Sequence, residues 1–240
     1  MEESKNLNWK PTDKRFVAFI DILGFKDLVM RSSHADIYSL LSKLSNHKDT
    51  IARIQESKQF SEMYEDVGIY TVSFSDSIAL FSKNDSADNF DFFTYSTGWL
   101  FARAIENSIP LKGAIAYGEI SINKTNQIYF GQAIIDAYLL EEELNYFGII
   151  AHNSIDNFLN NLKEESEQRI RYVETSTPLK CGNISHLNLN WFDLLEAFEK
   201  NKNKDDIIAI INQFKTTVSG SPRRYVDNTI TIINQIINSA

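Results

Sequence analysis

Two aspartates occupy positions at which metal-assisted chemistry becomes possible. Asp21 ends the apolar run FVAFID, and Asp76 lies between two short β-rich runs in YTVSFSDSIALF. A carboxylate at the inner end of a buried strand is costly unless another group compensates its charge. Paired hard oxygen ligands with open positions suit Mg²⁺ or Mn²⁺, which share their coordination shell with water and substrate phosphates. We therefore expect the two carboxylates to hold metal ions for phosphoryl chemistry.

The segment ILGFK, which follows Asp21, predicts a place for phosphate groups. Gly24 allows a tight turn before a helix, and N–H groups at a helix start attract anions. The expected phosphate donors are the backbone groups of Leu23, Gly24, Phe25 and Lys26. A simpler alternative is that Asp21 caps this helix and Asp76 fills a turn position, as Asp often does. The apolar run before Asp21, taken jointly with Asp76, favours the metal pair.

The surrounding sequence predicts the elements that position these residues. The run RFVAFID is continuously apolar, as in a central strand covered on both faces. Helical patterns follow it, then a hairpin around Asp76, a helix, a strand opened by Pro110, a short strand, a helix and a strand. This order predicts an α+β fold with a ferredoxin-like sheet, helices on it and a helical C-terminal extension. The first strand and the hairpin are neighbours in such a sheet, so the aspartates would converge.

The pattern changes after residue 165, and we expect three parts along the chain. These are a mobile leader at 1–14, a catalytic domain at 15–192 and a helical extension at 193–240 packed on the same domain. The region that follows residue 165 predicts a strand and an extended loop. Helices are expected at about 153–164, 191–201, 203–217 and 221–238.

Composition narrows the class of partner and compartment. The net charge of −8 argues against a nucleic-acid partner, whose affinity comes from Lys and Arg, but permits a nucleotide held through metal ions. No apolar run reaches the ~20 residues of a membrane span, and the N-terminus lacks the apolar core of a signal peptide. The single cysteine, Cys181, fits a reducing compartment. We expect a cytoplasmic protein with no membrane partner.

Four segments together resemble the class III nucleotidyl cyclases. FIDILGFKDL is similar to the segment that opens their catalytic domain, and SFSDSIALF is similar to the hairpin with their second metal aspartate. LKGAIAYGEI and YFGQAIIDAYLLEEELNYFG take the places of the central strand and the following helix. The resemblance covers about residues 15–152. It implies two Mg²⁺ or Mn²⁺ ions per site, held by Asp21, the Ile22 carbonyl and Asp76, and a phosphate-binding role for Lys180.

The chain departs from the adenylyl and guanylyl cyclases at four places. The positions of their purine-reading side chains hold Val72 and Ile128. The positions of the Asn and Arg that support the transition state hold Ile135 and Leu139. The metal-binding end is therefore kept while the purine-reading groups are replaced by apolar side chains.

This combination resembles a narrower family, the bacterial pyrimidine cyclases of the Pycsar anti-phage systems. The shared segments are GAIAYGE, the helix pattern G-x-A-I-x-x-A-Y-x-x-E and PLKCG…H…NW. The resemblance implies a phosphorus–oxygen lyase that converts UTP, or CTP, to the 3′,5′-cyclic monophosphate and pyrophosphate. The product, cUMP if UTP is the substrate, would activate a separate effector in antiviral defence.

The resemblance also implies a head-to-tail homodimer with two equivalent sites. Tyr70 and Lys112 lie on strands that should flank the nucleotide, so both are candidates for base binding. Two alternatives stay open. One is a cytidylate or purine cyclase with unusual base readers, and the other is a catalytically silent nucleotide-binding domain, which the missing Asn and Arg would fit.

Overall fold

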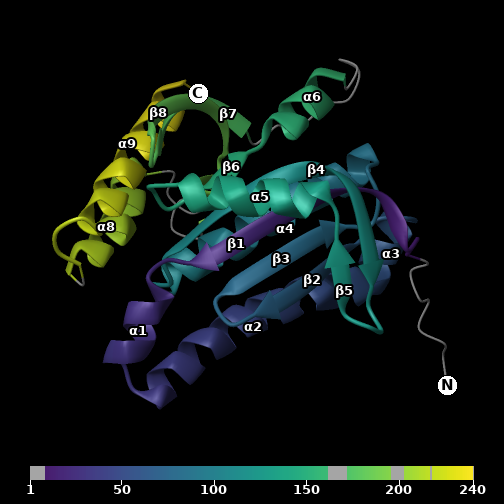
Figure 1. Cartoon of the computed structure of the whole chain (residues 1–240), viewed down its shortest axis with the longest axis horizontal. Helices are drawn as coiled ribbons and strands as arrows, with labels where there is room; N and C mark the ends of the chain where they lie inside the picture. Colours follow the sequence, from purple (N-terminus) through teal and green to yellow (C-terminus); the bar gives the residue numbers. More distant parts are fainter. Residues whose placement is uncertain (1–8, 162–171, 196–202, 217, 240) are drawn as a thin grey trace.

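The structure, a computed structural model, describes residues 9–161, 172–195, 203–216 and 218–239. Its centre is an eight-stranded sheet with the order β2-β3-β1-β4-β6-β8-β7, and β5 pairs with β4 (Figure 1). The β4–β6 pair is parallel and the other pairs are antiparallel. The strands are β1 Thr12–Ile22, β2 Ile69–Phe74, β3 Ser77–Ser82, β4 Leu111–Asn123, β5 Ile128–Phe130, β6 Ile149–Ala151, β7 Tyr172–Leu179 and β8 Gly182–Leu189.

Helices cover both faces of this sheet. In Figure 1, α5 crosses one face over β1 and β4, while α2 and α4 lie behind the sheet. The helices are α1 Phe25–Arg31, α2 His34–Glu56, α3 Lys58–Met63, α4 Ala87–Glu106, α5 Gln132–Glu143, α6 Asn153–Asn161, α8 Lys204–Gln213 and α9 Arg223–Ser239, with 3₁₀ turns η1 Phe192–Leu194 and η2 Phe214–Thr216. The expected α+β class is confirmed, and the order of elements as far as β6 follows the prediction except for α3, a short helix that the sequence did not predict.

The continuous apolar run of β1 is explained by this two-sided cover. Ala18 and Ile20 belong to the large core beneath α2 and α4, whereas Val17 belongs to a smaller core beneath α5. Successive side chains of a strand point to opposite faces. Asp21 therefore shares the α5 face with Val17 and Phe19, at the end of the strand.

The predicted leader and the predicted C-terminal elements differ in part from the structure. β1 begins at Thr12, which pairs with Ser121 of β4, so the last residues of the expected leader belong to the sheet. Residues 1–8 lie outside the described residues. The helix expected at 153–164 is described to Asn161, and the one expected at 191–201 is described only as the turn η1. The two later helices correspond to α8, extended by η2, and α9.

The strand and loop expected after residue 165 are a hairpin, β7–β8. Some of its polar side chains form a buried hydrogen-bond network, in which Asn188 donates to the Thr175 hydroxyl at 2.8 Å and to the Thr177 hydroxyl at 2.7 Å. All three residues are buried. A buried polar side chain is tolerated when it is hydrogen-bonded, so the alternation of polar and apolar residues is lost in this hairpin.

The C-terminal helices join the core of the rest of the chain. The Thr229 hydroxyl accepts from the Phe147 N–H at 2.8 Å, and Asn228 donates to the Asn145 carbonyl at 2.8 Å. Ile211 of α8 lies in the same apolar cluster as the residues of β1 and α4. No helix in the described part of the chain is long and apolar enough to cross a membrane.

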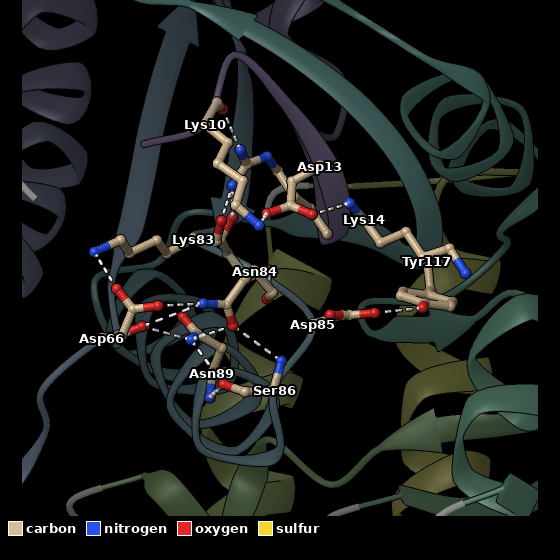
Figure 2. A network of polar contacts seen from close by, with 12 residues as sticks. Lys10, Asp13, Lys14, Asp66, Lys83, Asn84, Asp85, Ser86, Asn89 and Tyr117 are labelled. Carbon is tan, nitrogen blue, oxygen red and sulfur yellow. Dashed lines mark hydrogen bonds and ion pairs between the residues drawn. The ribbon is translucent and has the colours of Figure 1, made fainter. Parts of the chain in front are cut away.

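A polar network fixes the end of β3 that lies away from the β2–β3 turn (Figure 2). The buried Lys83 ammonium pairs with Asp66, and Asn89 donates to the Asp66 carbonyl at 2.9 Å. The Tyr117 hydroxyl donates to Asp85 at 2.7 Å. These contacts hold one end of the sheet together without involving Asp21 or Asp76.

Candidate active site

Asp21 and Asp76 lie at the same end of two neighbouring strands. Asp21 is opposite Ser77 in the β1–β3 register, and the Ser77 hydroxyl donates to Asp21 Oδ1 at 2.8 Å. Asp76 immediately precedes Ser77 in the two-residue turn between β2 and β3. The Ile22 N–H donates to the Asp76 carbonyl at 3.1 Å, so the backbone also joins the two segments. The predicted convergence of the hairpin and the first strand is therefore present.

The charge of the pair fits a divalent cation. Burial is the main cause that raises the pKa of Asp21, and the negative charge of Asp76 raises it further. The Ser77 hydrogen bond and the Lys112 charge act in the opposite direction on this pKa. Two carboxylates that disfavour each other's charge are stabilised by a shared cation. In the part of the chain that the structure describes, no group of three or more His, Cys, Asp or Glu forms a metal cluster, so an ion here would need further oxygen ligands from substrate and water.

The simpler capping alternative is wrong for Asp21. The N-cap of α1 is Gly24, and no side chain makes a capping hydrogen bond there. Gly24 has a φ of 72°, in the left-handed region that favours glycine, and a Cβ at this position would meet nothing within 4 Å. Asp76 does occupy a turn, as the alternative expected, but Asp21 needs another reason for its position.

One of the expected phosphate donors is already used. The Leu23 N–H donates to the Pro110 carbonyl at 2.9 Å, so the prediction for this group is wrong. The N–H groups of Phe25 and Lys26 lie in the first turn of α1, where an α-helix provides no internal acceptor. Pro110 directly precedes β4, and the contact between this residue and Leu23 cannot be predicted from the local sequence pattern.

Lys112 lies at the end of the sheet that carries Asp21 and Asp76, and it is in contact with α5. It is directly opposite Asp21 in the β1–β4 register. Its ammonium is 2.9 Å from Glu141 Oε1 and donates to the Glu141 carbonyl at 3.1 Å. The side chains of Lys112 and Glu141 are only 8% and 2% exposed, and burial raises the pKa of Glu141 to about 7. This ion pair leaves Lys112 in a different setting from the base-binding one that the sequence predicts.

Lys180 lies in the β7–β8 turn and contacts the C-terminal end of α5. Its N–H donates to the Glu143 carbonyl at 2.8 Å, and its half-exposed ammonium lies 3.9 Å from Glu142. The charge of Glu142 also contributes to the raised pKa of Asp21. The structure therefore places Lys180 at the C-terminal end of α5, beside a glutamate whose charge acts on Asp21.

Tyr70 is not brought together with the other predicted residues. It lies six positions before Asp76 on β2, about 20 Å along an extended chain. Its hydroxyl is 2.9 Å from that of Tyr129, and burial, then this hydrogen bond, raises the pKa of Tyr70 to about 12. The Lys124 ammonium lies 4.4 Å from the centre of its ring. These contacts indicate a packing role for Tyr70, at the part of the hairpin farther from Asp76.

Apolar side chains occupy the positions that the sequence resemblance assigns to the polar groups of purine cyclases. Val72 packs against the smaller core. Ile128 on β5 is 48% exposed, and Ile135 and Leu139, one turn apart on α5, are 50% and 57% exposed. Nothing in these side chains could read a purine edge by hydrogen bonding.

The sequence interpretation missed Glu141 as a buried partner of Lys112. Ala133, Ala137 and Glu141 recur every four residues on α5, and all three are buried. A carboxylate that continues an apolar i, i+4, i+8 stripe indicates a buried charge that needs a partner. Ser77, which donates to Asp21, gave no comparable signal.

Comparisons with solved structures identify the fold. The chain is similar to the catalytic core of a rhodopsin-guanylyl cyclase with converted specificity in complex with ATPalphaS, with a TM-score of 0.55, 17% identity, and coverage of 76% of this chain and 97% of that chain. A weaker match is an adenylate cyclase from Trypanosoma brucei, with a TM-score of 0.49, 14% identity, and coverage of 78% of this chain and 93% of that chain. Another is the adenylyl cyclase CyaB from P. aeruginosa, with a TM-score of 0.46, 13% identity, and coverage of 74% of this chain and 94% of that chain.

Sequence comparison adds no family assignment. No family model matches the chain, and no curated protein matches it. The mixed sheet, its helical cover and the first structural match show that the chain has the fold of class III nucleotidyl cyclase catalytic domains.

Proposed function

We propose that this chain is a nucleotidyl cyclase that converts UTP to 3′,5′-cyclic UMP and pyrophosphate. The observation that carries the proposal is the position of Asp21 and Asp76 at one end of a cyclase-type sheet, where burial and the charge of Asp76 raise the pKa of Asp21. This arrangement favours divalent cations and, with them, a polyphosphate substrate.

The chain's own residues have distinct parts in the reaction. Asp21, the Ile22 carbonyl and Asp76 would hold two Mg²⁺ or Mn²⁺ ions, which when bound would activate the attacking hydroxyl and offset phosphate charge. The N–H groups of the Gly24–Lys26 turn and the Lys180 ammonium orient the β- and γ-phosphates. The ribose 3′-oxygen then forms a bond to the α-phosphorus as the bond to pyrophosphate breaks in line. The hydroxyl proton leaves to solvent.

The pyrimidine preference is supported by the residues that a purine would meet. Val72 and Ile128 offer no hydrogen-bonding group at the purine-reading positions, and the resemblance to the Pycsar cyclases favours UTP over CTP. We extend the proposal to the product, which acts on a separate effector protein in anti-phage defence. CTP or a purine nucleotide is the second candidate substrate, and a silent nucleotide-binding domain is the alternative from another class.

The substrate assignment predicts a single main product from mixed nucleotides. Purified protein with Mn²⁺ and equal concentrations of ATP, GTP, CTP and UTP is expected to form cyclic UMP, identified by mass spectrometry. Cyclic CMP or a purine product would replace UTP as the substrate while keeping the cyclase activity. Nucleotide binding with no cyclic product from any of the four would establish the silent domain instead.

We also propose a homodimer in which the exposed apolar side chains of α5 face the second subunit. Leu139, 57% exposed, is expected to lie in this interface. Leu139→Glu should then shift the protein to a monomer in analytical ultracentrifugation and lower turnover at least about ten-fold, because a buried unpaired charge opposes association. Met63→Glu on α3, where the side chain is 63% exposed, is the matched control and should change neither. A wild-type protein that is active as a monomer would contradict the proposal.

A further inference from the structure

The Lys112–Glu141 ion pair joins β4 to α5 in the interior of the protein. Both side chains are almost fully buried, at 8% and 2% exposure. The ammonium donates to the Glu141 carbonyl at 3.1 Å and forms an ion pair with Glu141 Oε1 at 2.9 Å. Glu141 therefore restrains the lysine head through one hydrogen bond and one ion pair.

This restrained cation lies next to the candidate metal ligands. Lys112 is directly opposite Asp21, and side chains opposite each other on antiparallel strands share a face. The Lys112 charge also lowers the pKa of Asp21, against the dominant effect of burial, so the ammonium is within electrostatic range of that carboxylate.

Stability alone is a weak reason for such a pair. Two buried charges lose hydration on folding, and apolar side chains of similar size often stabilise as well or better. α5 already packs on the sheet through Ala133 and Ala137, and Tyr138 makes an edge-to-face contact with Phe19. Attachment of the helix therefore does not require the ion pair.

We propose that Glu141 is a positioning residue that fixes Lys112 as a cation beside Asp21, where the phosphates of the nucleotide bind. This inference rests on the proposed cyclase function and adds a residue to its site. A lysine head is ordinarily mobile at the end of its four-carbon chain. A cation held in place before the reaction stabilises developing negative charge without reorganisation. Ile135 and Leu139 supply no polar group from α5 that could take this part.

The charges around Glu141 predict how the strength of the Lys112–Glu141 ion pair depends on pH. Glu141 faces Lys112 from β4, Asp21 from β1 and Glu142 on its own helix, and burial raises its pKa to about 7. Below that pH the carboxyl gains a proton and holds the ammonium less strongly, so activity should decline. Its folded pKa exceeds the ordinary 4.5, so the contribution of Glu141 to folding stability is greatest below pH 4.5 and is lost as pH rises to 7. Activity and stability should thus change in opposite directions.

Three variants separate positioning from a purely structural role. Glu141→Ala is expected to raise KM for UTP about ten-fold or more and to weaken binding of 3′-deoxy-UTP with Mn²⁺ by a similar factor. Glu141→Gln is neutral like the protonated carboxyl, so its activity at pH 8 should already equal the lower level that the wild type reaches below pH 7, with no further decline near pH 7. The apolar pair Lys112→Met/Glu141→Leu should stay folded by circular dichroism and still bind the nucleotide weakly.

Asp66→Asn is the matched control, because it removes the carboxylate from another buried lysine, Lys83, at the opposite end of β3 (Figure 2). Its UTP kinetics should equal those of the wild type. Wild-type kinetics in Glu141→Ala, or wild-type turnover in the apolar pair, would overturn the positioning role. An inactive wild type would refute the proposed function, whereas the 3′-deoxy-UTP affinities would still decide the role of Glu141.

Discussion

The Asp21→Asn protein is expected to form no measurable cyclic nucleotide and yet to unfold at a higher temperature than the wild type. The carboxylate is a proposed metal ligand, so its loss should lower turnover at least about a thousand-fold. Burial and Asp76 raise the pKa of Asp21 above its ordinary value, so its ionised form opposes folding at neutral pH. Asparagine removes that charge and keeps an oxygen that can accept from Ser77. Product formation by mass spectrometry and thermal unfolding with EDTA measure the two effects.

Asp76→Asn should give the same loss of turnover, because the two carboxylates are expected to act on the same ions. Asp88→Asn, an exposed aspartate in the first turn of α4, is the control and should leave both measurements unchanged. Retention of more than about a tenth of wild-type turnover by either site variant would refute the metal-ligand assignment. A lower unfolding temperature of Asp21→Asn in EDTA would show that burial of this charge does not oppose folding.

Gly131→Ala is expected to destabilise the whole fold by about 3 kcal/mol or more. Gly131 precedes α5 with a φ of 153°, in the left-handed half of the backbone map that side chains rarely enter. A Cβ there would collide with the Glu119 carbonyl oxygen and lie 3.0 Å from the Ile120 Cα. These are backbone atoms of β4, so the clash can be relieved only by moving α5 off the sheet. Urea unfolding followed by circular dichroism measures the loss.

Gly182→Ala separates the clash from backbone strain. Gly182 also has a positive φ, of 126°, but a Cβ there would meet nothing within 4 Å. It should therefore cost only about 1–2 kcal/mol, the strain of the backbone conformation. Equal losses for the two variants would show that close packing of α5 on β4 is not what requires glycine at position 131.

The sequence by itself determined the parts of the site that depend on local pattern. The apolar run that ends at Asp21, the turn at Gly24 and the short runs around Asp76 each indicate an element over a few residues. Period-two and period-3.6 patterns are properties of neighbouring positions, so strand β1, the β2–β3 hairpin and α5 could be read directly. The order of these elements was sufficient to predict that the two aspartates meet.

The tertiary structure alone decided which of the other candidates belong to that site. It removed the Leu23 N–H, which bonds to Pro110, and left Tyr70 at the far part of the hairpin beside Tyr129. It joined Lys112 to Glu141, although 28 residues lie between them in the chain. Such contacts depend on strand register and on how a helix packs across a sheet, which join positions distant in sequence. A local pattern shows that a charge is buried, but only the packed fold supplies its partner.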